Sequence, residues 1–162
     1  MKIAILVHSM SGNTRKFADN LATRLTADGH IVTLTQLETD VPIKGGTRHH
    51  HNPFQITNLP PLSEAEIVLL GCPVWAFGVS VVMAEAMKKL GNLKGKSVLN
   101  FVTMGFPLKC MGGSAALNYM NKSAGTMGAK VLPGSICCQM FHNLDAEIDK
   151  ESQRIAAMLK AQ

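Results

Sequence analysis

A short polar segment near the start of the chain has the residue types of a phosphate-binding loop. It follows an apolar run that begins at Ile3, and a helical pattern begins directly after it. The first N–H groups of a helix have no partner inside the helix, and the helix dipole favours negative charge at that end. Side chains of the segment can add further donors; its residues are Ser9, Met10, Ser11, Gly12, Asn13 and Thr14. The segment therefore predicts an anion-binding loop above the first strand of a sheet.

The charged residues after this segment are also consistent with an anion. Asp or Glu normally occupies the first turn of a helix, where it complements the dipole. Here the first charged residues are Arg15 and Lys16, and Asp19 comes later. Each cation at the N-terminus of a helix lowers the helix stability by roughly a few tenths of a kcal/mol through the dipole. A bound phosphate dianion would make the same cations stabilising. A solvated helix face that tolerates the repulsion explains the pattern equally well.

Three other kinds of phosphate chemistry are excluded by the residues around the loop. A low-molecular-weight tyrosine phosphatase needs a cysteine nucleophile at the start of such a loop, and the first cysteine is Cys72. A receiver domain needs carboxylates after its first and third strands to hold Mg²⁺, where this chain has His8 and Gly71. A Walker-type NTPase needs a lysine before the hydroxyl residue, and Asn13 stands before Thr14.

Strand-like and helix-like patterns alternate along the whole chain. We expect strands at Ile3–His8, His30–Leu37, Ile67–Gly71, Ser97–Thr103 and Ala129–Cys138, and helices at Asn13–Asp28, Ser80–Leu90, Ser114–Met127 and Leu144–Lys160. Such alternation builds right-handed βαβ units. The predicted fold is therefore α/β: one domain over residues 1–162, with a doubly wound five-stranded parallel sheet in the order 2-1-3-4-5 inside a three-layer α/β/α sandwich.

One stretch interrupts this alternation. Residues 38–63 lack apolar periodicity and are expected to form an irregular loop, which in α/β proteins is often functional. Glycine and proline recur in it, at Pro42, Gly45, Gly46, Pro53, Pro60 and Pro61. It also contains the run Arg48-His49-His50-His51. Neighbouring histidine side chains point apart, so we expect a solvated or substrate-facing loop here and no metal site.

The loops after the third and fourth strands are expected to join the first loop, because ligands of such sheets bind at the carboxyl ends of the strands. The first of these two loops contains Pro73, Val74, Trp75, Ala76, Phe77 and Gly78, and the second contains Thr103, Met104, Gly105, Phe106 and, further on, Gly112. Aromatic residues make up only 5% of the chain, yet three of them lie in these loops. Aromatic faces beside a phosphate site indicate a flat ligand that can be stacked.

These three loops resemble the cofactor loops of the flavodoxin family. The segment from Ser9 to Thr14, with Phe17-Ala18 after it, resembles the FMN phosphate loop, and Gly71–Gly78 is similar to the ring-stacking loop. Thr103-Met104-Gly105, followed by Gly112-Gly113, resembles the third loop. The resemblance spans nearly the whole chain and implies FMN as the cofactor. It also implies that Pro73 to Gly78 line the isoalloxazine, with Trp75 or Phe77 against its face, and that Thr103 to Phe106 close the other side.

The function implied by this resemblance is electron transfer through a bound flavin. The flavin carries out the redox chemistry, so no catalytic residue of the protein is expected. The alternative is an FMN-dependent reductase that uses NAD(P)H to reduce a quinone or a similar acceptor. A third hypothesis, a flavin-free interaction module, is disfavoured by the intact phosphate loop. Typical flavodoxins are acidic, whereas this chain has a net charge of +5. Positive charge attracts nicotinamide phosphates and leans towards the reductase.

Composition limits the other partners. No apolar run reaches the ~20 residues of a membrane span, and no secretory signal precedes the first strand, so we expect a cytoplasmic protein with no membrane partner. Nucleic acid is not expected, because the chain has no run rich in lysine or arginine. The four cysteines lack metal-ligand spacing and are expected to be reduced, small apolar residues. The electron partner is expected to be a redox protein or a small-molecule acceptor.

Overall fold

Five parallel strands form the central layer, in the order β2-β1-β3-β5-β6. The computed structural model describes residues 1–47 and 52–161, so the predicted histidine run at 49–51 lies outside the described residues. The strands are β1 (Lys2–Val7), β2 (Ile31–Gln36), β3 (Ile67–Trp75), β4 (Gly78–Val79), β5 (Ser97–Met104) and β6 (Lys130–Cys138), and the helices are α1 (Asn13–Ala27), α2 (Val81–Lys89), α3 (Gly113–Thr126) and α4 (Leu144–Lys160). The predicted fold class and strand order are confirmed, since β4 is a short addition at the end of β3.

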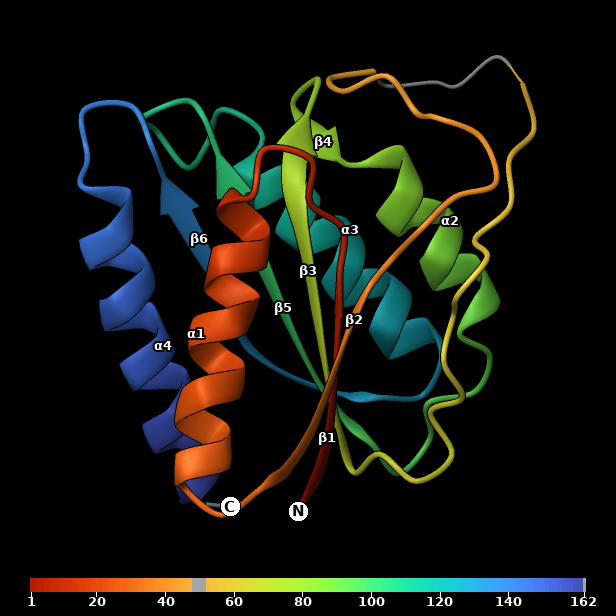
Figure 1. Cartoon of the computed structure of the whole chain (residues 1–162), viewed down its shortest axis with the longest axis vertical. Coiled ribbons are helices and arrows are strands. Elements are labelled where there is room, and N and C mark those ends of the chain that lie inside the picture. Colours follow the sequence, from red (N-terminus) through yellow and green to blue (C-terminus); the bar gives the residue numbers. More distant parts are fainter. Residues whose placement is uncertain (48–51, 162) are drawn as a thin grey trace.

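The sheet has one apolar core on each face, because successive side chains of a strand point to opposite sides. In β1, Ile3, Ile5 and Val7 pack with α1 and α4, whereas Ala4 and Leu6 belong to the core beneath α2 and α3. Figure 1 shows these two helix pairs on opposite sides of the sheet. In the part of the chain that the structure describes, no helix has the length and apolar character needed to cross a membrane.

The segment between β2 and β3 covers part of the second face. Its described residues form neither helix nor strand apart from one isolated bridge between Thr39 and Ile56. It nevertheless supplies apolar side chains to the core beside α2: Leu37, Ile43, Leu62 and Ala65 are buried, and Phe54, Ile56 and Leu59 pack against them. Scattered apolar residues of this segment therefore cover the sheet here, as the apolar face of an amphipathic helix does elsewhere on the sheet.

The third strand is longer than its apolar run predicts. It continues past Gly71 to Trp75 and then folds back into β4, with Trp75 paired to Gly78. The two residues of the turn, Ala76 and Phe77, both have positive φ, at 44° and 63°. This is the backbone of a two-residue hairpin turn, which Asn-Gly usually signals. Non-glycine residues in this conformation cost about 1–2 kcal/mol each.

Gly71 marks a place where the core leaves no room for a side chain. A Cβ at this position would lie 2.1 Å from Cζ of Phe101 on the neighbouring strand β5. The Phe101 ring also contacts Phe17 of α1, with 4.8 Å between ring centroids. The ring therefore fills the space above Gly71 and links the central strands to the helix that follows the first loop.

We predict that Gly71→Ala lowers the free energy of unfolding by about 3 kcal/mol, because the ring of Phe101 has to leave its position. The matched control is Gly125→Ala on α3, where the nearest atom to a Cβ is 4.0 Å away. This second substitution should raise the stability by up to about 1 kcal/mol through helix propensity. Urea denaturation measures both changes, and a Gly71→Ala protein as stable as the parent would contradict the packing described.

Candidate functional site

The loops that follow β1, β3 and β5 meet at the carboxyl ends of the strands, at the top of Figure 1. This end of the sheet is called the carboxyl edge below. Thr14, in the first turn of α1, and Thr103, near the end of β5, share a buried hydrogen bond of 2.7 Å between their hydroxyl oxygens. Gly112 approaches the β3–β4 hairpin so closely that a Cβ would lie 2.6 Å from Cα of Phe77, and its φ is 105°. The structure thus brings all three predicted loops into contact.

The N-terminus of α1 is open and has no side-chain cap. Gly12 occupies the N-cap position with a φ of 89°, makes no side-chain capping hydrogen bond, and would have no atom within 4 Å of a Cβ. The first turn contains no acidic residue. A helix N-terminus without a capping side chain or an acidic first turn leaves its first N–H groups to other partners, and an anion suits them.

Ser9 gives this loop a second polar group that needs a partner. The residue is only 9% exposed, and its hydroxyl has no hydrogen-bond partner among the described residues. A buried polar group without a partner is costly, and in native structures such groups usually have a ligand, an ion or a water to bind. The Thr14–Thr103 pair adds one more donor, because one hydroxyl hydrogen is left when the other makes the hydrogen bond.

The two cations at the start of α1 are already compensated within the protein. Arg15 makes a 2.8 Å ion pair with Asp19, and Lys16 makes a 2.6 Å ion pair with Asp145 of α4. Arg15 also donates to Gln36 at the end of β2. These side chains therefore do not require an anion, whereas the uncapped loop and the hydroxyl of Ser9 do lack partners.

His8, directly before the loop, has a contact that the sequence does not reveal. Its Nδ1 lies 2.9 Å from Oγ of Ser80, a residue 72 positions later that caps α2 by accepting the N–H of Met83. A serine hydroxyl can donate one hydrogen bond and accept two, so a neutral ring with its hydrogen on either nitrogen satisfies this contact. Burial favours the neutral ring and lowers the pKa of His8 to about 4.

The three aromatic residues of the loops lie in different surroundings. Trp75 is buried at the end of β3, and its ring meets that of His8 edge to face, with centroids 4.9 Å apart. Phe77 and Phe106 are exposed and stack on one another, with 5.6 Å between centroids and 10° between planes. The rings that flat ligands could reach at the surface are therefore Phe77, on the hairpin, and Phe106, on the loop after β5.

The remaining predicted site residues line the same edge. Met10 is exposed, and Gly45 of the segment after β2 lies against it, so that a Cβ there would be 3.3 Å from its sulfur. A cavity of about 420 Å³ lies between these parts; it is lined by His8, Ser9, Met10, Leu37, Glu38, Thr39, Pro42, Ile43 and Val82. Met104 is buried against α3, whereas Gly105 has open space around it. Pro73 and Val74 belong to β3 and not to a loop.

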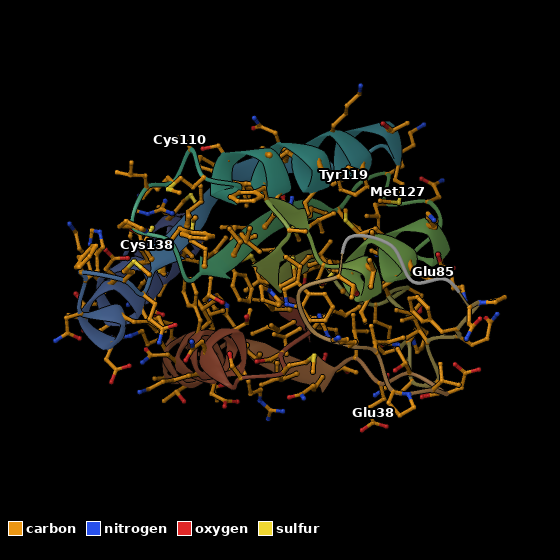
Figure 2. The ribbon with its side chains drawn as sticks, turned by 90° about the horizontal axis from the view of Figure 1, so that it is seen from above. Glu38, Glu85, Cys110, Tyr119, Met127 and Cys138 are labelled. Atoms are coloured by element: carbon orange, nitrogen blue, oxygen red, sulfur yellow. The ribbon has the colours of Figure 1, made fainter. Side chains whose placement is uncertain are left out.

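Three of the four cysteines are buried in the fold. Cys72 is buried with its sulfur 3.7 Å from that of Met120, and burial raises its pKa to about 12. Cys137 and Cys138 are buried too, whereas Cys110 is exposed. Figure 2, which looks down on this edge, shows Cys110 and Cys138 towards the same side of the molecule. The described residues contain no cluster of side chains that could hold a metal ion.

Comparisons with known proteins agree with the observed topology. The model of a family described by its flavodoxin-like fold matches residues 1–161. Oxidised flavodoxin 1 from Bacillus cereus is similar in structure, with a TM-score of 0.71 and 20% identity over 100% of this chain and 99% of that one. A flavodoxin from the domain Archaea gives a TM-score of 0.66 at 20% identity, covering 99% of both chains. Rubredoxin oxygen:oxidoreductase from Desulfovibrio gigas gives 0.63 at 19% identity, covering 99% of this chain and 36% of that one. No curated protein sequence matches the chain.

The buried, neutral His8 makes the stability depend on pH in a defined direction. Between pH 6.5, its ordinary pKa, and about pH 4, the unfolded chain binds a proton that the folded chain does not. The free energy of unfolding should therefore fall as the pH is lowered through this window, by up to about 3 kcal/mol from this group. Urea denaturation at pH 7 and pH 4 measures the loss. His8→Asn, which keeps an acceptor for Ser80 but cannot titrate, should lose correspondingly less, and equal losses would contradict the assignment.

Proposed function

The chain belongs to the family of proteins with a flavodoxin-like fold, and on this premise we propose that it binds FMN at the carboxyl edge of the sheet and transfers electrons. Solved structures with this arrangement of elements include proteins named as flavodoxins from a bacterium and from an archaeon. Their identity to this chain is 20%, so the cofactor has to be argued from the residues of this chain.

The observation that carries the proposal is the unpartnered hydroxyl of Ser9 beside an open helix N-terminus. A phosphate group can accept hydrogen bonds from the serine hydroxyl, from the first N–H groups of α1 and from the spare hydroxyl hydrogen of Thr14 or Thr103. All of these are neutral donors, and the nearby cations are already paired with carboxylates. The site therefore fits a phosphate monoester bound through backbone and hydroxyl groups.

The ring of the cofactor would lie towards Phe77 and Phe106. Two parallel rings with a third between them need about 7 Å, that is, two contact distances of ~3.5 Å. The two phenylalanines are 5.6 Å apart, so a flat ring enters only if they separate, and it then replaces one aromatic contact by two. Because both side chains are exposed, an edge of the bound ring would remain reachable from solvent.

The bound flavin supplies the electron chemistry, and this chain supplies binding and surroundings. His8 is neutral at physiological pH and Cys72 keeps its proton, so neither buried group adds a charge beneath the loops. The hairpin residues Val74 to Val79 and the loop residues Thr103 to Pro107 contain no charged side chain. The residues thus provide an apolar, uncharged setting for the ring with no acid or base in it.

An NAD(P)H-dependent reductase remains the second candidate, and one observation favours it. The cavity of about 420 Å³ beside His8, Met10 and the segment after β2 offers space next to the phosphate loop that a pure electron carrier does not need. The net charge of +5 would also attract an anionic nicotinamide cofactor. A redox protein or a small-molecule acceptor is the expected partner in either case.

We predict opposite effects of Ser9→Ala on stability and on ligand binding. Removing a buried hydroxyl that has no partner should leave the ligand-free protein as stable as before or slightly more so. The same change should weaken FMN binding about tenfold, the equivalent of one hydrogen bond to a charged group. Quenching of FMN fluorescence measures the Kd, and thermal unfolding measures the stability.

Ser152→Ala is the matched control for this test. Ser152 lies on α4 and has the same kind of buried, unpartnered hydroxyl, but it belongs to a helix away from the loops. Its substitution should be neutral in stability and leave the Kd for FMN unchanged. A parent protein that does not quench FMN fluorescence at all would overturn the FMN proposal, whereas equal Kd values for Ser9→Ala and the parent would remove the role of Ser9.

An assay with nicotinamide cofactors separates the two candidate functions. An electron carrier should accept electrons from dithionite but show no steady oxidation of NADH or NADPH with benzoquinone above the level of free FMN. A reductase should oxidise one of them at a rate proportional to the concentration of the FMN-loaded protein. Absorbance at 340 nm measures the rate, and sustained turnover would reject the carrier in favour of the reductase.

A further inference from the structure

Bulky apolar side chains are exposed around the carboxyl edge. They belong to the four loops that follow β1, β3, β5 and β6, and we call them the apolar rim: Met10, Phe77, Phe106, Leu108, Met140 and Phe141. In the part of the chain that the structure describes, the other large apolar side chains that are exposed are Met1, Ile31, Val41 and Tyr119. Single exposed apolar residues are ordinary, but a group of them at one end of a molecule indicates a contact surface.

The loops that carry the rim are fastened to one another. The N–H of Met140 donates to the carbonyl of Gly105 at 2.9 Å, and Nε2 of His142 lies 3.2 Å from the carbonyl oxygen of Pro107. The stacked phenylalanine rings described above join the loop after β5 to the hairpin β3–β4. The first loop meets them through the hydroxyl pair of the candidate site. The rim therefore belongs to one connected surface.

Two phenylalanines of the rim lie on unfavourable backbone. Phe77 and Phe141 have φ values of 63° and 61°, yet their side chains are 59% and 90% exposed. The left-handed region suits glycine or asparagine better than a bulky residue. Phe141 lies outside the residues of the proposed cofactor site, and its side chain is almost entirely in water. Neither backbone preference nor burial within the protein explains a phenylalanine there, whereas a contact with something outside the protein does.

The loops of the rim contain no Asp or Glu; they comprise residues 9–14, 74–79, 104–112 and 139–143. Their one Lys or Arg is Lys109, which is exposed and forms no ion pair among the described residues. Burial raises the pKa of Cys138 and Lys109 opposes that rise, so Lys109 lies near the end of β6 that precedes Phe141. The exposed Lys44 and Glu38 carry opposite charges and follow β2, at the other side of the sheet. An unpaired cation therefore borders the apolar side chains, in a chain whose net charge is +5.

An anionic lipid bilayer fits these features better than a second copy of the chain or a groove on another protein. The rim consists of separate loop ends, and a bilayer can admit each apolar side chain without a preformed pocket for Phe141. A second copy would bring two positively charged surfaces together, which is unfavourable. Apolar side chains that enter the acyl boundary, with basic ones among anionic headgroups, are the pattern of proteins that dock on a membrane surface.

We propose that the apolar rim docks this protein end-on on anionic membranes: Leu108, Met140 and Phe141 enter the lipid, and Lys109 contacts the headgroups. The strands then point towards the bilayer, and the candidate cofactor site faces the lipid. The docking itself does not depend on the proposed function. The sequence-based expectation of no membrane partner rests on the lack of a spanning run, and docking on the surface needs no such run.

The test is co-sedimentation of the protein with two kinds of vesicle, one of phosphatidylcholine alone and one of equal parts phosphatidylcholine and phosphatidylglycerol. At low salt the parent protein should bind the anionic vesicles and leave the neutral ones in large excess unbound. Binding should weaken when the salt is raised to about 1 M, where the Debye length falls to ~3 Å.

Phe141→Asn removes the apolar ring and suits the left-handed backbone, so the variant should be at least as stable as the parent. Its partition coefficient on anionic vesicles should fall about tenfold, because one large apolar side chain no longer enters the lipid. Ile31→Asn is the matched control: Ile31 is 64% exposed, but it begins β2 at the opposite end of the strands (Figure 1). This variant should bind vesicles as the parent does.

Lys109→Ala should lower the same partition coefficient about fivefold, the effect of one basic residue near an anionic surface. Lys130→Ala is its control, because it removes the same charge from the first residue of β6, at the far end of the strands. It should leave vesicle binding nearly unchanged. Neither Phe141 nor Lys109 is among the predicted cofactor residues, so the Kd for FMN should stay at the parent value in both variants.

Several results would overturn the proposal. Equal losses in Lys109→Ala and Lys130→Ala, or a Phe141→Asn protein that binds like the parent, would mean attraction by net charge alone. Binding to neither kind of vesicle would reject docking on lipid. Self-association in sedimentation velocity that Phe141→Asn abolishes would assign the rim to a second copy instead. Vesicle binding is measured without flavin, so a protein that binds vesicles but not FMN rejects the proposed function alone, and the converse rejects this inference alone.

Discussion

All strands of the main sheet run in the same direction, and this constraint determines where everything else in the molecule lies. Each parallel strand must be followed by a connection that carries the chain back to the end of the sheet where the next strand begins. The loops that follow the strands therefore all leave from the same end, where the strands have their carboxyl termini. The loops after β1, β3, β5 and β6 therefore meet, although residues 9 and 139 are far apart in the chain. The hydroxyl pair of Thr14 and Thr103 and the contact of Gly112 with Phe77 result from that convergence.

The two ends of the sheet differ in which residues have unusual backbone conformations. Among the described residues, the three non-glycine residues with positive φ, Ala76, Phe77 and Phe141, all lie where the loops meet, whereas Gly29 and Gly91 show that positive φ elsewhere falls on glycine. The cores on the two faces are continuous and apolar, and they bury Phe17 and Phe101 completely. Strained backbone at a candidate site is tolerated when the surrounding structure fixes it. In this molecule, the packed layers and the hydrogen bonds between neighbouring loops do so.

Sequence patterns predicted what depends on local periodicity and missed what depends on distant contacts. The apolar runs and the strand-loop-helix order around Ser9 to Thr14 were sufficient for the fold class and for the strand order. The hairpin β3–β4 was missed because Ala76 and Phe77 are not turn residues by type, and Trp75 accordingly lies inside a strand. Two contacts have no local signal at all: His8 meets Ser80 72 residues away, and His142 meets Pro107 35 residues away. The exposure of Cys110 likewise depends on how the loop lies on the folded protein.

Because irregular chain covers one face of β2, the strands of the sheet differ in their stability against local opening. The edge strand β2 has neighbours only on one side, is covered by α1 on one face and meets irregular chain on the other, and Ile31 is 64% exposed. The strands β3 and β5 lie inside the sheet between two helix layers. Opening β2 therefore breaks one strand pairing and little core, whereas opening β5 requires the cooperative loss of both cores. Amide hydrogens of β2 should exchange with solvent through local openings, and those of β5 only through global unfolding.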